Sequence, residues 1–254
     1  MVAGVQSVER AFRLLELLGS ADDFLAISDL ARMSGLPLGT THRLLDTLVQ
    51  LEYVERDPHS RRYTLGLKTL QLRGAVIGHM NLGMQAMPVM KALMQQVNET
   101  VHLAVLNDGE IVYIDRIEGL HTQGMYTRIG KRAPAHCTAL GKVLLAFLPQ
   151  DGWREVVSRR GLRRFTPHTI TSVEELEREL ATIRERQFAI DDEEVEIGVR
   201  CVAAPVRDYS GEVVAAVSIS GPISRVFPER DRELAEAICW AGRLISAKLG
   251  YLGR

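Results

Sequence analysis

The sequence predicts an α+β chain of two domains, in which a small N-terminal helical module precedes a larger domain built on an antiparallel sheet. Three observations lead to this prediction. Residues 27–65 have the pattern of two short helices and a hairpin, the apolar period changes from helical to alternating at Glu99, and no GxGxxG motif or P-loop occurs. At 254 residues, the chain is also longer than the N-terminal module requires.

The N-terminal module begins with three predicted helices. The first is indicated by an apolar stripe at helical spacing, formed by Val8, Ala11, Phe12, Leu15 and Leu18. In the second, Ser28 is predicted to cap the start, and Gly35 suits the left-handed residue just past the end. Pro37 fits the first turn of the third helix. The inward face of that helix is predicted to carry Leu44, Leu45, Leu48 and Leu51.

The outward face of the third helix has the composition of a helix that lies in a DNA major groove. Its residues are small, hydroxylated or hydrogen-bonding: Gly39, Thr40, His42, Arg43, Thr47 and Gln50. Residues 53–57 and 61–65 then read as two strands around the turn Asp57-Pro58-His59-Ser60. The pattern predicts a winged helix-turn-helix, the alternative being a helical subdomain with a solvated charged hairpin. The predicted DNA-binding residues are Ser28, Thr40, Thr41, His42, Arg43, Arg56, Arg61 and Arg62.

Composition narrows the class of protein. No apolar run approaches the roughly 18 residues of a membrane span, and the N-terminal residues lack a signal-peptide pattern. The three cysteines, Cys137, Cys201 and Cys239, are widely spaced without a CxxC motif, which argues against disulfide scaffolding and a structural zinc site. We therefore expect a cytoplasmic protein without a membrane partner.

Charge is unevenly distributed along the chain. The net charge of −1 is poor support for nucleic-acid binding, but five basic residues against one acidic residue lie between Arg56 and Arg73. Because the first eighty residues are nearly neutral, one copy is expected to bind DNA weakly. DNA-binding modules of this kind usually gain affinity by dimerising on an operator with two half-sites.

The middle of the chain is predicted to connect the two domains. Residues 66–77 carry Leu67, Leu70 and Leu72 in a helical pattern and lack the composition of a flexible tether. The methionines at positions 80, 84, 87, 90 and 94 favour packing over ligand binding. Pro88 is predicted to start a new helix that ends near Val97. The expected domains are residues 1–65, a linker helix over 66–87, and residues 88–254.

The C-terminal domain is predicted to be a sheet with helices. TVHLAVLN and EIVYIDRI flank Asp108-Gly109 and form a strong hairpin signal, with a third strand expected from Thr122. Thr138 is predicted to cap a helix that stops at Pro149, and two charged amphipathic segments follow. FAIDDEEVE, CVAAPVRD and VVAAVSISG read as strands, and residues 228–249 as a closing helix.

In order along the chain, several of these segments resemble the IclR family of bacterial transcriptional regulators. They are VQSVERAFRLLELL, the winged module, ETVHLAVL, IVYIDRI, HCTALGKVLLA, IDDEEVEIGVRCVAAPV and SISGPISR. Asp191, Glu194, Cys201 and Asp208 meet the family's C-terminal signature, whereas Gln187 and Arg207 depart from it. Leu38-Gly39 also stands where a Lys-Ser pair is common in the family, which shifts the expected DNA contacts towards Arg43 and the wing.

The resemblance implies a non-enzymatic, dimeric winged helix-turn-helix regulator without a cofactor, whose C-terminal domain has a GAF- or PAS-like form. It further implies palindromic double-stranded operator DNA, a homodimer or dimer of dimers, and a small organic or aromatic acid as effector. Repression of a catabolic operon is the expected output. The matching effector-binding positions are Met125, Ala139, Leu140, Asp191, Val199, Cys201, Ser218 and Ser220.

Residue chemistry at these positions agrees with a small anionic ligand. Ala139 and Leu140 fall in the first turn of a helix, whose free N–H groups favour a carboxylate. Ser218 and Ser220 alternate along a strand and point to one face, while Met125 and Val199 can form an apolar wall. Asp191 can accept a hydrogen bond from a ligand hydroxyl or cap a turn. Cys201 also fits as a small core residue.

Other functions remain open at this point. A metal site assembled from His136, Cys137 and either His102 or His121 lacks a recognised ligand spacing. An enzyme or redox sensor that uses Cys201 or Cys137 would need a low thiol pKa, and the sequence supplies no base and oxyanion donors beside either. A structural DNA-bridging tetramer with a vestigial pocket is the third alternative. Effector identity, target operon and dimer versus tetramer do not follow from the sequence.

Overall fold

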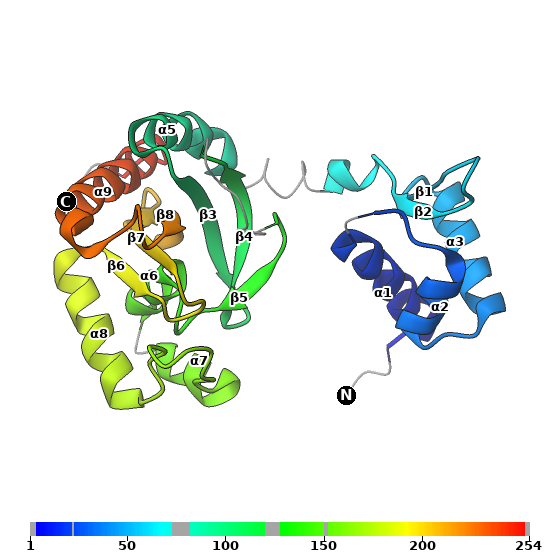
Figure 1. The fold of residues 1–254 in the computed structure, drawn as a ribbon, viewed down its shortest axis with the longest axis horizontal. Helices are drawn as coiled ribbons and strands as arrows, with labels where there is room; N and C mark the ends of the chain where they lie inside the picture. The colour runs from blue at the N-terminus through cyan, green and yellow to red at the C-terminus, as the bar shows by residue number, and fades with distance from the viewer. Residues whose placement is uncertain (1–3, 22, 73–81, 120–127, 150–151, 252–254) are drawn as a thin grey trace. The chain divides into compact units, whose positions relative to one another are not determined.

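The computed structural model describes residues 4–21, 23–72, 82–119, 128–149 and 152–251 (Figure 1). The chain divides into two compact units, Met1–His79 and Met80–Arg254, each with its own hydrophobic core. Within the described ranges, no helix is both long and apolar enough to cross a membrane.

The N-terminal unit is a winged helix-turn-helix, as predicted. Its elements are α1 (Gln6–Ser20), α2 (Ile27–Ser34), α3 (Leu38–Gln50), β1 (Val54–Arg56) and β2 (Tyr63–Leu65). The two strands pair antiparallel. The unit is held by one small core, whose buried members are Leu14, Leu18, Leu30, Leu45, Leu48, Val54 and Tyr63. After the wing, residues 69–72 of the predicted linker helix (66–87) are helical and residues 82–87 begin a longer helix, while residues 73–81 lie outside the described residues.

Local details of this unit confirm some predictions and correct others. Gly35 ends α2 in the left-handed conformation with φ of 70°. The predicted Ser28 cap is wrong, because α2 begins at Ile27 after the cap residue Ala26, two residues earlier than a Ser28 cap requires, and Ser28 is an exposed helical residue. Leu51 does not face inward either. It is the first residue after α3 and is 48% exposed.

The C-terminal unit is built on a six-stranded antiparallel sheet in the order β5-β4-β3-β8-β7-β6. Its strands are β3 (Thr100–Asn107), β4 (Glu110–Ile117), β5 (Arg132–Pro134), β6 (Ala189–Asp192), β7 (Val199–Arg207) and β8 (Val213–Pro222). Its helical elements are α5 (Leu82–Val97), α6 (Ala139–Ala146), α7 (Gly152–Arg160), α8 (Val173–Arg186), η2 (Pro228–Arg230) and α9 (Asp231–Lys248). The predicted α+β fold is confirmed.

Helices cover both faces of this sheet (Figure 1). α5 and α9 pack on one face with inward strand residues such as Val101 and Ile219. α6, α7 and α8 pack on the other face with residues such as Ala104 and Ala216. Because side chains alternate along a strand, the polar His102, Ser218 and Ser220 also point to the α6 face. This alternation puts polar groups inside the domain.

One prediction about this unit is wrong, and another falls mainly outside the described residues. The helix expected to begin at Pro88 is continuous from Leu82, with Pro88 inside it. Pro88 lies on the exposed side of α5, where a missing hydrogen bond is tolerated because Ala86, Val89 and Met90 anchor the buried side. Most of the third strand predicted from Thr122 lies outside the described residues, and the described strand that pairs with the outer edge of β4 is β5.

The methionine series is divided between core and surface. Met90 is fully buried and Met94 packs against the same core, as a packing role predicts. Met84 is 68% exposed, and Met80 lies outside the described residues.

Candidate functional site

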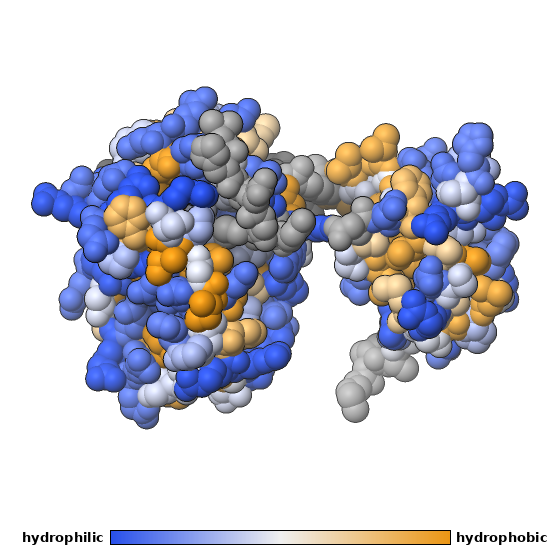
Figure 2. Space-filling model, viewed as in Figure 1, coloured by the Kyte–Doolittle hydropathy of each residue, from blue (hydrophilic) through white to orange (hydrophobic). Residues whose placement is uncertain are grey.

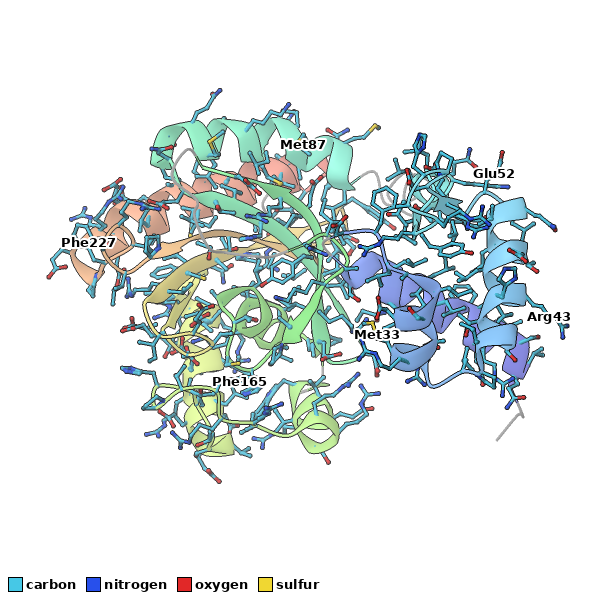
Figure 3. All side chains as sticks on the ribbon, turned by 45° about the vertical axis from the view of Figure 1, so that its right-hand side comes forward. Met33, Arg43, Glu52, Met87, Phe165 and Phe227 are labelled. Atoms are coloured by element: carbon cyan, nitrogen blue, oxygen red, sulfur yellow. The ribbon has the colours of Figure 1, made fainter. Side chains whose placement is uncertain are left out.

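The outward face of α3 presents hydrogen-bonding side chains to solvent. His42, Arg43, Thr47 and Gln50 are exposed, and Thr40 is half-buried. Arg43 projects away from the unit (Figure 3). The Nδ1 atom of His42 lies 2.8 Å from the Oδ2 atom of Asp46, one turn further along. This carboxylate orients His42 across the helix surface.

Thr41 does not belong to this face, which corrects its assignment to the DNA-binding set. Its side chain is completely buried, and its hydroxyl donates to the carbonyl of Pro37 at 3.2 Å. The physical reason is helical periodicity, since Thr41 lies four and seven residues before the buried Leu45 and Leu48. The hydrogen bond from Thr41 to Pro37 stabilises the start of α3, and the buried Thr41 side chain cannot contact a DNA base.

The wing holds its three arginines in different ways. Arg56 stacks over the Tyr63 ring at 5.3 Å, and Arg62 donates to the carbonyl of Phe24 at 3.4 Å. Arg61 is exposed at the end of the turn with φ of 60°. The turn is tightened by Asp57, whose Oδ1 accepts from the backbone N–H of His59 at 3.1 Å. Arg61 is therefore the arginine most available to a phosphate.

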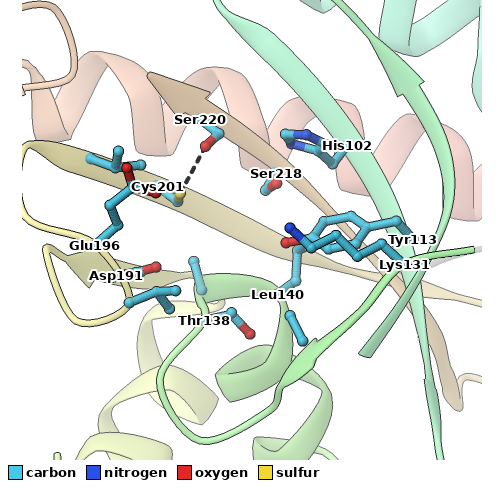
Figure 4. Close-up of a pocket in the computed structure, with 14 residues that line it drawn as sticks. His102, Tyr113, Lys131, Thr138, Leu140, Asp191, Glu196, Cys201, Ser218 and Ser220 are labelled. Carbon is cyan, nitrogen blue, oxygen red and sulfur yellow. Dashed lines mark hydrogen bonds between the residues drawn. The ribbon is translucent and has the colours of Figure 1, made fainter. Parts of the chain in front are cut away.

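A cavity of about 140 Å³ lies between the sheet and the N-terminus of α6 (Figure 4). Seven of the eight predicted effector-binding residues line it, and the eighth, Met125, lies outside the described residues. The lining residues are His102, Tyr113, Lys131, Ala133, Thr138, Ala139, Leu140, Asp191, Val195, Glu196, Val199, Cys201, Ser218 and Ser220. An engineered cavity of roughly 150 Å³ holds benzene, so this one suits a small organic molecule.

The strand register forms one polar row across the floor of the cavity. Asp191 on β6 lies opposite Cys201 on β7, and Cys201 lies opposite Ser220 on β8. The Sγ atom of Cys201 and the Oγ atom of Ser220 are 2.9 Å apart. Residues distant in sequence are thus neighbours because the three strands align them.

The start of α6 supplies backbone donors. Thr138 caps the helix, as predicted, and its hydroxyl accepts from the N–H of Gly141 at 3.1 Å. The N–H groups of Ala139 and Leu140 precede the first hydrogen bond of the helix and have no acceptor among the described residues. Gly141 is required, because a Cβ there would meet the backbone of Ala135 at 2.3 Å. The close approach brings the free amides to the cavity.

A buried charged cluster supports the same helix. Lys142 is 2% exposed, pairs with Glu194, and lies 3.7 Å from Glu179. Asp191 accepts from the backbone N–H of Glu194 at 2.8 Å, so it caps the turn after β6 while also lining the cavity. Burial raises the pKa of Asp191 to about 7, although Lys142 opposes the shift. Asp191 therefore changes its charge near neutral pH.

His102 and Tyr113, which sequence analysis did not place in the site, line the opposite end of the cavity. Burial, with the nearby Arg116 charge, lowers the pKa of His102 to about 3, so its imidazole is neutral. The His102 and Tyr113 rings are 5.2 Å apart and tilted by 59°. The alternation in TVHLAVLN was a usable signal, since it sets His102 on the opposite face from Val101 and Leu103.

Thiol chemistry and metal binding gain no support from this geometry. Burial raises the pKa of both Cys137 and Cys201, the opposite of what a thiolate nucleophile requires. In the part of the chain that the structure describes, no three His, Cys, Asp or Glu side chains gather around a possible metal position. His121, one of the ligands considered, lies outside that part.

A winged helix-turn-helix joined to a separate domain with an internal polar cavity defines a DNA-binding regulator. Residues 7–58 match the IclR helix-turn-helix domain, and residues 74–247 match the C-terminal domain of the bacterial transcriptional regulator IclR. The chain belongs to the IclR family of bacterial transcriptional regulators.

Known members are similar over nearly their whole length. The chain is 38% identical to the transcriptional regulator XynR of Escherichia coli over 97% of this chain and 98% of that protein. It is 34% identical to the transcriptional repressor IclR of the same species, over 97% and 90%.

Solved structures share the fold. The IclR protein of Thermotoga maritima has a TM-score of 0.83 at 32% identity, covering 97% of this chain and 99% of that one. An IclR homologue from Microbacterium hydrocarbonoxydans, complexed with 4-hydroxybenzoate, has a TM-score of 0.86 at 28% identity, covering 96% and 98%.

Proposed function

We propose that this transcriptional regulator is controlled by a small organic acid that binds in the cavity above the sheet. The observation that carries the proposal is the pair of free N–H groups of Ala139 and Leu140 at the N-terminus of α6, beside a polar row of side chains. A helix N-terminus stabilises an anion through its N–H groups and dipole. The remaining wall, including Val199 and Leu140, suits the ligand's carbon skeleton.

Asp191 restricts which acids fit. A charged carboxylate beside an ionised Asp191 would be repelled, whereas a protonated Asp191 donates a hydrogen bond. Because its pKa lies at about 7, the pocket accepts the acid together with a proton on Asp191. The cavity size favours acids no larger than a substituted six-membered ring.

On the DNA side, the proposed base-reading residues are Thr40, His42 and Arg43 of α3. Arg56, Arg61 and Arg62 of the wing contact phosphate or the minor groove. Ser28 lies exposed in the first turn of α2, whose free N–H groups suit a phosphate. These roles follow from exposure and from the usual docking of such modules.

We further propose repression of a catabolic operon through a palindromic operator, by a cytoplasmic dimer or dimer of dimers. Names of relatives support repression: the IclR protein of E. coli and the AllR protein of Klebsiella pneumoniae are described as repressors. Exposed apolar side chains support self-association. Phe12 on α1 is 58% exposed and Leu67 is 74% exposed, and the hydrophobic colouring of Figure 2 marks such groups on this unit.

Two measurements on the full-length protein test the proposal. A thermal-shift screen of small organic acids is expected to find at least one that raises the melting temperature in proportion to its concentration. A salt-dependent gel shift with DNA from upstream of its own gene is expected to show binding that the same acid alters. If no acid stabilises the protein, the effector class is wrong, and if the folded dimer binds no DNA at low salt, the DNA assignment is wrong.

A further inference from the structure

Two polar atoms inside the cavity lack a hydrogen-bond partner among the described residues. They are the Nε2 atom of His102 and the Oγ atom of Ser218, on side chains that are 2% and 1% exposed. Buried polar groups in folded proteins are nearly always paired, so each exception needs an explanation. Both atoms belong to residues that line the cavity, where a ligand atom could pair them.

The two groups form one local pair. His102 on β3 and Ser218 on β8 are direct partners in the strand register, and alternation points both to the cavity face. Tyr113 packs its ring 5.2 Å from the His102 ring and limits its rotation. Figure 4 shows His102 and Ser218 together, with Tyr113 below them.

This pair lies at the far end of the cavity from Asp191. The sheet order β3-β8-β7-β6 separates His102 from Asp191 by three strand spacings, roughly 14 Å. In Figure 4, Asp191 and Cys201 occupy one side and His102 and Tyr113 the other, with Thr138 and Leu140 at the start of α6 between them. A ligand held by its carboxylate at α6 can therefore extend a second group towards His102.

The chemistry of the pair selects that second group. At neutral pH the His102 imidazole is uncharged and offers one N–H donor and one acceptor nitrogen, and Ser218 can donate or accept. Two neutral partners of this kind match a hydroxyl or carbonyl oxygen. A carboxylate that faced only His102 and Ser218 would lose its hydration in exchange for two neutral partners, which is unfavourable, although Lys131 also lines this end of the cavity (Figure 4).

We propose that His102 and Ser218 form a specificity subsite that binds a hydroxyl or carbonyl oxygen of the effector at the end remote from its carboxylate. The inference rests on the proposed function, because it takes a carboxylate at the start of α6 as given. It narrows the effector to carboxylic acids that carry a second, uncharged oxygen group. A bound water is the alternative partner for the two atoms.

Matched pairs of acids test the subsite by calorimetric titration of the full-length protein. The probes are benzoate and 4-hydroxybenzoate, butyrate and 4-hydroxybutyrate, and pentanoate and 4-oxopentanoate. In at least one pair, the oxygenated acid is expected to bind about tenfold or more tightly than its partner, since a buried hydrogen bond is then gained. His102→Leu is expected to remove this preference by weakening only the oxygenated acid.

Stability of the ligand-free variants separates a binding role from a structural one. Removing an unpaired buried polar group does not sacrifice a hydrogen bond, so Ser218→Ala is expected to keep or raise the melting temperature. Ser246→Ala is the matched control, because its buried hydroxyl donates to the Gly242 carbonyl at 2.6 Å and accepts from the Arg207 N–H at 2.8 Å. That control should melt lower and keep the ligand preference.

The outcomes of these experiments distinguish failure of the subsite proposal from failure of the proposed acid effector. Equal binding within every pair would overturn the subsite, as a bound water predicts, and leave the acid effector intact. Binding of none of the acids would overturn both. A lower melting temperature in His102→Leu and Ser218→Ala with an unchanged preference would assign the pair a structural role and contradict the subsite.

Discussion

The two units hold their proposed functional groups in opposite environments. In the N-terminal unit, Arg43 and Arg61 are exposed and hydrated, and a small apolar core behind them supplies the stability. In the C-terminal unit, His102, Asp191 and Ser218 are buried, two of them with polar atoms that have no described partner. An exposed contact costs the free protein little, whereas an internal site removes polar groups from water. Other interactions within the C-terminal unit must therefore compensate for the free-energy cost of burying these polar groups.

The largest predicted effect tests that compensation. Lys142→Met keeps most of the length of the side chain but leaves Glu194 buried without its cation, which should destabilise the C-terminal unit by about 3–5 kcal/mol. Arg154→Met is the control, because its ion pair with Glu177 is half-exposed and should contribute less than about 1 kcal/mol. Urea unfolding followed by circular dichroism measures both. Similar losses of unfolding free energy in the two variants would mean that the buried Lys142–Glu194 pair stabilises the unit no more than an exposed ion pair does.

The next prediction concerns the apolar core of the N-terminal unit. Leu45→Ala should destabilise that unit by about 3 kcal/mol, because its fully buried side chain leaves a cavity behind α3. DNA binding should fall steeply while acid binding by the other unit persists. Calorimetric unfolding together with a ligand titration checks this. Loss of acid binding would show that the two units do not act separately.

Substitutions of the exposed residues proposed to contact DNA should have smaller effects, and these effects should differ between α3 and the wing. Arg43→Ala should relax base preference at one operator position, at a cost of about 1–3 kcal/mol for the preferred base. Arg61→Ala should weaken all sequences alike and reduce the salt slope by about one. Binding titrations over a salt series, with operator variants, distinguish the two. Identical behaviour would refute the assignment of α3 to the groove and the wing to the backbone.

The last prediction is a pH dependence that is specific to the internal site. Burial raises the pKa of Asp191 to about 7, well above its ordinary value, so the folded unit holds a proton that the unfolded chain releases. Asp191 therefore stabilises the fold at low pH, and this contribution is lost as pH rises from about 4 to 7. Acid affinity should likewise fall above pH 7, by up to about tenfold per unit.

Asp191→Asn is the variant that isolates this dependence. It should flatten the pH dependence of both quantities relative to the wild type, even though the lowered pKa of His136 gives an opposite slope. Unfolding and ligand titrations from pH 5 to 8 measure the difference between the two proteins. An unchanged slope in Asp191→Asn would exclude Asp191 as the titrating group.

Much of the N-terminal unit was predictable because its signals are local. Gly35 past the end of a helix, and Leu45 and Leu48 at helical spacing, depend only on nearby residues. The errors arose where helix phase mattered. A shift of two residues at the start of α2 turned Ser28 from a cap into a helical residue, and Thr41 belongs to the inward face that Leu45 and Leu48 define.

The residues of the internal site were likewise predictable only in part. The resemblance supplied Asp191, Cys201, Ser218 and Ser220, and strand alternation added only that the two serines point to one face. His102 and Tyr113 reach the same cavity only through strand order, since β3 pairs with β8 more than a hundred residues later. Sequence periodicity gives the face of a strand but not its neighbour. The continuous helix through Pro88 has the same origin, because packing on both sides of the proline overrides its local preference.

The central claim is that the internal cavity controls the external DNA surface. The direct measurement is the DNA affinity of the full-length protein, by fluorescence anisotropy, with and without the acid that most raises its melting temperature. The expected change is at least about fivefold, and saturating DNA should change the acid affinity by the same factor. An acid that binds tightly but leaves DNA affinity unchanged would contradict the account.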